Sequence, residues 1–169
     1  MRLLSNSLVA IVTISVCGLI LRAQRPPTTP NGTLPPLSLG NFSISLNVKK
    51  LEVSKEFYEK MGFKVIAGDE KQNYLILQNE TSTIGLFQGI IEKNSLTFNP
   101  GWDREGKTMA DFLDVREIQK ELRSRGISPE TSVDENTAGP GYMMIMDPDG
   151  NPILIDQHAS KAESKQQSR

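Results

Sequence analysis

The eight residues FSISLNVK, at positions 42–49, decide the fold because apolar and polar side chains alternate along them. Successive side chains of a β-strand point to opposite faces, so Ile44, Leu46 and Val48 mark the buried face of a predicted strand. Residues 95–99, with the sequence SLTFN, repeat its order of Ser, apolar, hydroxyl, apolar, Asn. The two stretches predict strands in equivalent places of two similar halves.

A helix and three short strands are predicted after the first strand. Residues 52–61 place Val53, Phe57 and Met61 at four-residue spacing, and Gly62 follows where a helix would end. Three short β-prone runs, separated by polar turns, come next at 63–66, 74–77 and 83–87. The first half therefore has the order βαβββ.

The second half repeats these elements around an insertion. Asp114 and Glu117 have the spacing of a capping box at a helix start, and Gly126 follows at the helix end. The separation between equivalent positions of the two halves grows from 52 residues at the first strand (95 minus 43) to 64 at the helix end (126 minus 62). About a dozen extra residues, from Pro100 to near Met109, therefore lie between the second half's first strand and its helix.

Composition limits the class of protein. The 169 residues include 37% hydrophobic and 23% charged side chains, which suits one globular domain. Nineteen Lys and Arg oppose twenty Asp and Glu, so the net charge of -1 gives no basic surface for nucleic acid. The single cysteine, Cys17, allows neither an intramolecular disulfide nor a cysteine zinc site. We therefore predict no nucleic-acid partner.

The N-terminus has the features of an export signal. Residues 3–21 carry no charge and follow a basic residue, which predicts a signal peptide or a signal anchor over 1–25. Five of the ten prolines come next, so 26–38 is predicted to be an extended linker. The folded domain then covers 39–158, and 159–169 is a polar, disordered tail. The protein is expected to be exported (periplasmic, secreted or membrane-anchored) and to meet a membrane only through its N-terminus.

The paired βαβββ order resembles the vicinal oxygen chelate superfamily, which includes glyoxalase I, bleomycin-resistance proteins and extradiol dioxygenases. The motifs that carry the resemblance are LNV at 46–48, SKEFY at 54–58, MGF at 61–63 and DPDGN at 147–151. The resemblance covers most of 39–158. It implies an α+β fold in which two βαβββ modules form an incompletely closed eight-stranded mixed sheet around one pocket, with the helices outside. It implies little about chemistry, because one fold hosts many activities.

Enzymes of this superfamily hold a divalent ion with side chains from the first and last strand of each module. The matching positions in this sequence are Ser43, Gly85, Ser95 and Leu154. Such an ion needs carboxylate, imidazole or several oxygen ligands, and two serine hydroxyls do not replace them. We therefore predict neither a metal ion nor a cofactor, and whether the protein is an enzyme stays open.

A pocket lined by neutral polar side chains follows from the strand faces. If the apolar residues pack on the helices, the small polar residues between them face the pocket. The predicted ligand-binding residues are Ser43, Ser45, Asn47, Gly85, Phe87, Ser95, Thr97, Asn99, Trp102 and Leu154. The insertion would form a rim or lid that carries the only tryptophan. In a second reading, the polar residues simply fit a narrow sheet interior and Trp102 plugs the core.

Two further features are read as structural. His158, the only histidine, follows the last strand and is expected at the surface rather than in catalysis. Asp147 and Asp149 belong to a Pro and Gly hairpin turn, since their spacing does not match a calcium loop.

Together, these features predict a metal-free domain that binds a small neutral or weakly polar molecule. One alternative is a glyoxalase-type lyase or dioxygenase with an atypical metal site. Another is a structural dimerisation module, in which two copies of the chain form a homodimer. A tightly held divalent ion would favour the enzyme, whereas small-molecule binding that is lost when the pocket is filled would exclude the purely structural role.

Overall fold

The computed structural model describes residues 32–161. The predicted signal segment at 1–25 lies outside the described residues, as do part of the linker and most of the tail. Within the described range, none of the helices has both the length and the apolar character needed to cross a bilayer.

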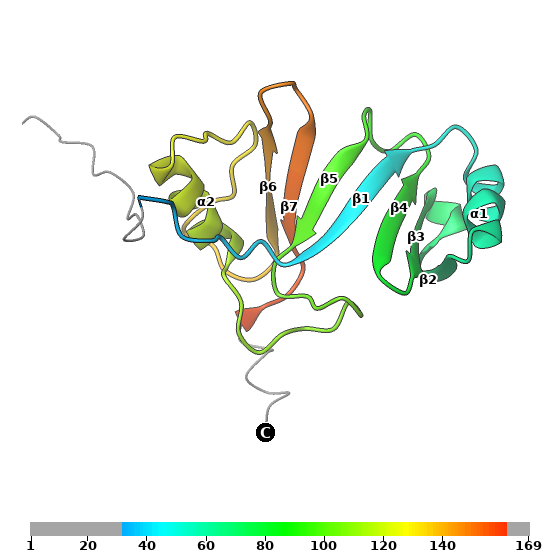
Figure 1. The fold of residues 1–169 in the computed structure, drawn as a ribbon, viewed down its shortest axis with the longest axis horizontal. Coiled ribbons are helices and arrows are strands. Elements are labelled where there is room, and N and C mark those ends of the chain that lie inside the picture. Colours follow the sequence, from blue (N-terminus) through cyan, green and yellow to red (C-terminus); the bar gives the residue numbers. More distant parts are fainter. Residues whose placement is uncertain (1–31, 162–169) are drawn as a thin grey trace, which may run out of the picture.

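Seven strands form one open mixed sheet in the order β2-β3-β4-β1-β5-β7-β6 (Figure 1). The strands are β1 (Asn41–Asn47), β2 (Lys64–Asp69), β3 (Tyr74–Asn79), β4 (Ser82–Phe87), β5 (Ser95–Asn99), β6 (Gly141–Met146) and β7 (Pro152–Gln157). The helices are α1 (Leu51–Lys60), α2 (Val115–Ser124) and the short 3-10 turn η1 (Glu70–Gln72). Figure 1 shows α1 and α2 at opposite ends of the sheet. The α+β class is therefore confirmed.

The two halves of the chain meet at the centre of the sheet. β1 and β5 pair antiparallel, with Ser43 opposite Thr97 and Ser45 opposite Ser95. Each then pairs in parallel with the last strand of its own half, β1 with β4 and β5 with β7. The pleat places every second residue of these four strands on one face. The small polar residues of β1 and β5 therefore share the face opposite the helices.

The prediction of eight strands is wrong for the described residues, which contain seven. After α2, the chain pairs with β6 only at an isolated bridge between Thr131 and Met144. Pro129 lies just before this bridge and has no backbone N–H to donate to a ladder. The segment at the place of the predicted eighth strand therefore pairs with the sheet at one residue and does not form a strand.

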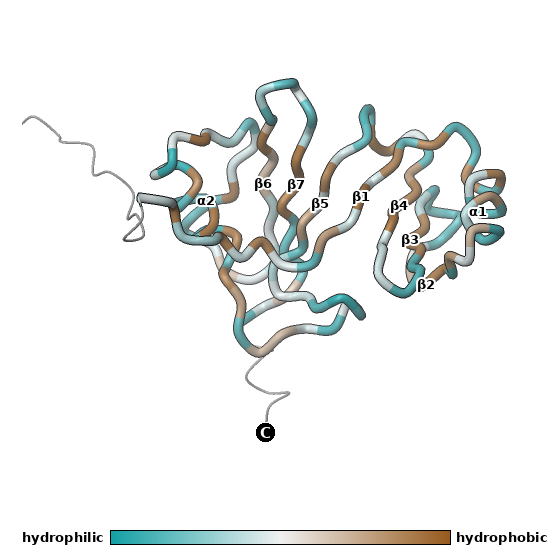
Figure 2. Tube along the Cα trace, in the orientation of Figure 1, coloured by the Kyte–Doolittle hydropathy of each residue, from teal (hydrophilic) through white to brown (hydrophobic). Residues whose placement is uncertain are grey.

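Each helix covers its own hydrophobic core. The core under α1 consists of Leu51, Leu75, Leu77, Ile84 and Leu86. The core under α2 consists of Val115, Ile118, Leu122, Val133, Met143, Ile145 and Ile155. Figure 2 shows brown, hydrophobic stretches in β3 and β4 on the side of the sheet that carries α1, and in β6 and β7 on the side that carries α2. The two cores fix the two ends of the sheet and leave its other face open.

The predicted helix starts agree with the structure. However, the side of α1 that faces the core is not the side that carries its regularly spaced apolar residues. Val53, Phe57 and Met61 are 61%, 59% and 55% exposed, whereas Leu51 is buried and Tyr58 packs on the core. The apolar spacing therefore predicts the helix correctly without identifying its buried side.

The α2 capping box is confirmed. The Asp114 carboxylate accepts from the backbone N–H of Arg116 at 2.9 Å, and Glu117 accepts from the N–H of Asp114 at 3.0 Å.

Candidate functional site

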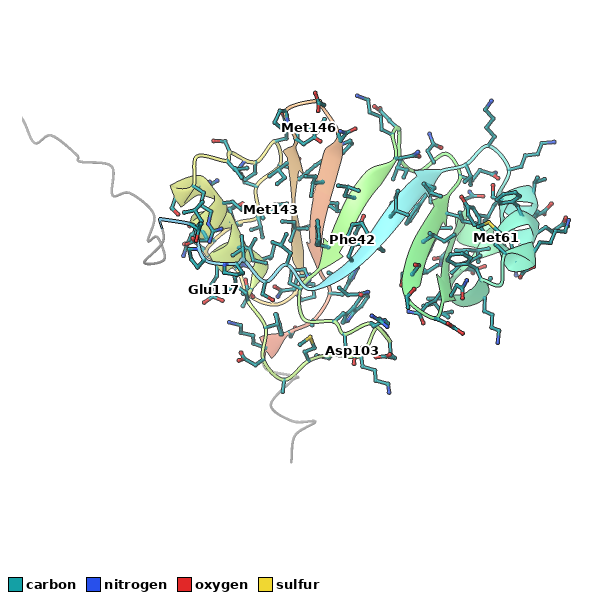
Figure 3. All side chains as sticks on the ribbon, in the orientation of Figure 1. Phe42, Met61, Asp103, Glu117, Met143 and Met146 are labelled. Carbon is teal, nitrogen blue, oxygen red and sulfur yellow. The ribbon has the colours of Figure 1, made fainter. Side chains whose placement is uncertain are left out.

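A cavity of about 1080 Å³ lies on the open face of the sheet, and residues from both halves line it. β1 and β5 form its floor, and β3, β4, β6 and β7 contribute its walls. Figure 3 labels Met146, which lines the cavity, near one end of the strands and Asp103 in the inserted loop near the other. The site is therefore a trough that runs along the central strands.

The floor of the trough is polar. Ser45 Oγ and Thr97 Oγ1 lie 2.9 Å apart and share a hydrogen bond, and both side chains are buried. The neighbouring hydroxyls of Ser43 and Ser95 form no hydrogen bond with any described residue. Two hydroxyl groups are thus available on the cavity floor to a bound molecule.

The wall on the β3 and β4 side is aromatic and aliphatic. The rings of Tyr74 and Phe87 are stacked, with centroids 6.0 Å apart and planes 8° apart. Gly85 leaves room for this arrangement, because a Cβ atom there would lie 2.5 Å from Cε2 of Phe87. The opposite wall comes from Met144, Met146, Pro152 and Leu154. A polar floor between apolar walls suits a ligand with an apolar body and a few polar groups.

The predicted insertion forms a loop at one end of the cavity. Trp102 pairs with Thr108 in an isolated bridge, and the Gln78 amide donates to the Arg104 carbonyl oxygen at 2.7 Å. This hydrogen bond ties the loop to β3 on the far side of β1. Trp102 lines the cavity and belongs to neither hydrophobic core. The loop is therefore a rim of the trough, as the first reading of the sequence predicts.

His158 is exposed, as the sequence predicts, with 47% of its side chain accessible, but its place in the cavity was missed. It lines the cavity and stacks on Trp102, with ring centroids 4.4 Å apart and planes 11° apart. Its Nε2 lies 3.0 Å from Oδ2 of Asp156. The hydrogen bond to Asp156 raises the pKa of His158 above the ordinary histidine value, and burial only partly opposes it. The available signal was the alternation 152, 154, 156, 158, which continues the cavity face of β7 past its end.

Nine of the ten predicted binding residues line this cavity, and Asn47 does not. Asn47 is exposed, and its side-chain amide donates to the Glu92 carbonyl oxygen at 3.1 Å. Its own backbone N–H donates to Oδ1 of Asn94 at 2.9 Å. Asn47 therefore fixes the turn before β5 instead of facing the trough. Ligand binding by the other nine residues stays a prediction.

The four positions where the superfamily places metal ligands do not fit a metal ion. Ser43 and Ser95 offer only hydroxyls, Leu154 is apolar, and Phe87 occupies the space beside Gly85. Between residues 32 and 161, no three His, Cys, Asp or Glu side chains gather closely enough to hold an ion. Two neutral hydroxyl groups bind a hard or borderline cation too weakly to hold it without carboxylate or imidazole ligands.

Comparison with known proteins gives a family match for most of the domain. The sequence profile of the Glyoxalase/Bleomycin resistance protein/Dioxygenase superfamily matches residues 41–155. No curated protein sequence matches the chain.

Solved structures with a similar fold include a protein described as NAD-dependent benzaldehyde dehydrogenase from Legionella pneumophila. That protein is 18% identical with a TM-score of 0.52, and the match covers 70% of this chain and 99% of the other. A glyoxalase/bleomycin resistance protein/dioxygenase superfamily member from Vibrio splendidus is 14% identical over 69% and 97% of the two chains, with a TM-score of 0.48. Homoprotocatechuate 2,3-dioxygenase from Arthrobacter globiformis is 21% identical over 73% and 37%, with a TM-score of 0.44. At these identities the likeness concerns the fold alone.

Proposed function

The chain belongs to the Glyoxalase/Bleomycin resistance protein/Dioxygenase superfamily, and on that basis we propose that its domain binds a small neutral or weakly polar molecule in the trough, without a metal ion. The two halves, β1 to β4 with α1 and β5 to β7 with α2, would act as the family's paired modules around one ligand.

The unbonded hydroxyls of Ser43 and Ser95 on the cavity floor carry this proposal. These half-buried hydroxyls have no partner among the described residues, so a ligand in the cavity can replace their water contacts with direct hydrogen bonds. The cavity volume of about 1080 Å³ lies slightly above the range of roughly 300–1,000 Å³ that small-molecule sites usually enclose. The stacked Tyr74 and Phe87 would cover the apolar body of the ligand.

The charges around the trough favour a ligand without net charge. Three acids and three bases line it: Glu92, Glu105 and Asp156, and Lys93, Arg104 and His158. With His158 neutral these groups sum to -1, and with His158 protonated they sum to zero. A strongly anionic ligand would find no excess of positive charge, and a cation would meet only a weak attraction.

Export, or tethering through the N-terminal segment, is proposed on the sequence alone. The uncharged stretch at 3–21 and the proline-rich linker behind it support this location. Cell fractionation, combined with N-terminal sequencing of the mature protein, tests it and distinguishes a cleaved signal from a retained anchor.

Native mass spectrometry of protein recovered from its own cells tests the binding function. We expect one co-purifying compound per chain, and we expect Ser43→Trp to lose it because the indole fills the floor of the trough. Phe42→Trp is the matched control, since Phe42 lies on the opposite face of the same strand and is 51% exposed. Equal retention by both variants contradicts the proposal, and one tightly held divalent ion per chain contradicts its metal-free part.

A further inference from the structure

We propose that His158 forms a subsite at the loop end of the trough, where it accepts a hydrogen bond from an acidic hydroxyl group of the ligand, such as that of a phenol or an enol. The inference rests on the proposed binding function. It adds the chemical group that the ligand presents at this end.

The contact with Asp156 decides which ring nitrogen of His158 carries the proton. Nε2 lies 3.0 Å from Oδ2 of Asp156, and because an ionised carboxylate can only accept a hydrogen bond, this contact favours the proton on Nε2. In the neutral ring, Nδ1 then has a free lone pair. No described residue forms a hydrogen bond with Nδ1. The neutral ring can therefore accept a hydrogen bond from a molecule in the cavity that it lines.

Packing holds the imidazole at this place. Trp102 stacks on it at 4.4 Å, and the loop that carries Trp102 is tied to β3 through the bond from Gln78 to the Arg104 carbonyl. A ring fixed on one side by stacking and at one nitrogen by a carboxylate is oriented before any ligand arrives. Such preorganisation lowers the entropic cost of binding.

The surrounding charges favour a neutral donor over an anion. Asp156 on β7 is the ionisable group in contact with the ring, Arg104 and Glu105 of the loop line the same cavity, and Tyr142 of β6 pairs with Asp156 in the sheet. An anion at this end would approach the carboxylates of Asp156 and Glu105 as well as the Arg104 guanidinium, so it would meet no net positive charge while the imidazole is neutral. A hydroxyl donor avoids that repulsion and uses the lone pair of Nδ1.

Isothermal titration calorimetry with two matched probes at pH 8 tests the subsite. 1-Naphthol and 1-methoxynaphthalene have the same ring system, and only the first can donate a hydrogen bond. We expect wild-type protein to bind 1-naphthol about tenfold more tightly, as one net hydrogen bond allows. His158→Phe keeps an aromatic ring against Trp102 but lacks the hydrogen-bond acceptor. The two probes should therefore bind this variant with about equal affinity. Equal affinity of the two probes for wild type overturns the proposal.

A second measurement needs no variant. Because the chain has one histidine, its ring Cε1–H gives a single NMR signal that titrates with His158 alone. A hydroxyl donor binds the neutral ring, so saturating 1-naphthol should move the titration midpoint to lower pH, by the reciprocity of linked equilibria. An unchanged midpoint overturns the subsite. A midpoint that moves to higher pH also overturns it, because an anionic ligand paired with the imidazolium gives that result.

The experiment separates this inference from the binding function. If both probes bind wild type with equal affinity and Ser43→Trp abolishes both, the trough binds small molecules and the His158 subsite is wrong. If neither probe binds, the subsite as proposed is wrong, and native mass spectrometry of the co-purifying compound still decides the binding function.

Discussion

The ring of Phe87 occupies the space into which a side chain at Gly85 would project, with 2.5 Å from the Cβ position to Cε2 of the ring. Phe87 is also stacked on Tyr74, so the ring cannot swing away without losing that contact. One corner of the cavity is therefore closed by an aromatic ring beside Gly85, one of the four positions to which the family resemblance assigns a metal ligand.

Gly85→Ala should destabilise the domain because its methyl group overlaps the Phe87 ring. We expect the free energy of unfolding to fall by about 1–3 kcal/mol, the usual cost of overpacking. Urea denaturation of Gly85→Ala, Phe87→Ala and the double variant measures it. The double variant should lose less free energy of unfolding than the sum of the losses in the two single variants. Strict additivity would show that the Phe87 ring does not limit the space at position 85.

The hydrogen bond from Gln78 to the Arg104 carbonyl should hold the loop closed over one end of the trough. Gln78→Ala removes it, and an exposed hydrogen bond of this kind contributes at most about 0.5–1.5 kcal/mol. Limited digestion with trypsin, which cleaves after Arg104 and Lys107 in this loop, should become several times faster. Gln72→Ala, in an exposed turn, is the control and should leave the cleavage rate unchanged.

Asp156→Asn should lower the pKa of His158 toward its ordinary value of about 6.5, because the hydrogen bond to the Asp156 carboxylate is the main cause that raises it. In wild type, the raised pKa means that the imidazolium contributes stability. That contribution is fully present below pH 6.5 and is lost as the pH rises through the folded-state pKa. NMR titration of the single histidine checks the shift, and an unchanged midpoint in Asp156→Asn would contradict the assignment.

Asp114 should stabilise the domain at neutral pH and lose this effect in acid. Burial acts to raise the pKa of Asp114, but hydrogen bonds from the Arg116 backbone, the Gln157 amide and the Arg116 guanidinium together lower it. The stability is present above the ordinary carboxyl pKa and is lost as the pH falls through the lower folded value.

Asp114→Ala removes this N-cap and should cost about 0.5–2 kcal/mol at pH 7. Thermal denaturation at pH 7 and pH 3 measures the difference, which should shrink in acid. Asp111→Ala, an exposed acid in the preceding loop, serves as the control. A deficit for Asp114→Ala of the same size at both pH values would exclude the proposed pH dependence.

The two faces of α1 should differ sharply in their tolerance to substitution. Leu51 is 4% exposed and packs in the core, so Leu51→Ala should cost about 2–5 kcal/mol. Val53 is 61% exposed, so Val53→Ala should change stability by less than about 0.5 kcal/mol. Urea denaturation of both variants compares them, and similar losses would mean that the exposed face of α1 is covered in solution.

The sequence alone predicted the features that depend on neighbours within a few residues. Alternation along 42–49 and 95–99 placed the polar side chains on one face of two strands, because the pleat repeats every two residues. The spacing of Asp114 and Glu117 predicted the start of α2, since capping involves only the first helical turn. These local rules, together with the family resemblance for the α+β class, were enough for nine of the ten residues that the sequence placed in the trough.

Tertiary structure alone decided the features that join distant parts of the chain. Trp102 and His158 are 56 positions apart in sequence, and only the path of the inserted loop stacks their rings. Likewise, the buried side of α1 depends on where the helix sits over β3 and β4, and the single bridge at Thr131 depends on how the chain passes β6. Local periodicity cannot fix these contacts, because their energies arise between segments whose relative position is set by packing of the whole domain.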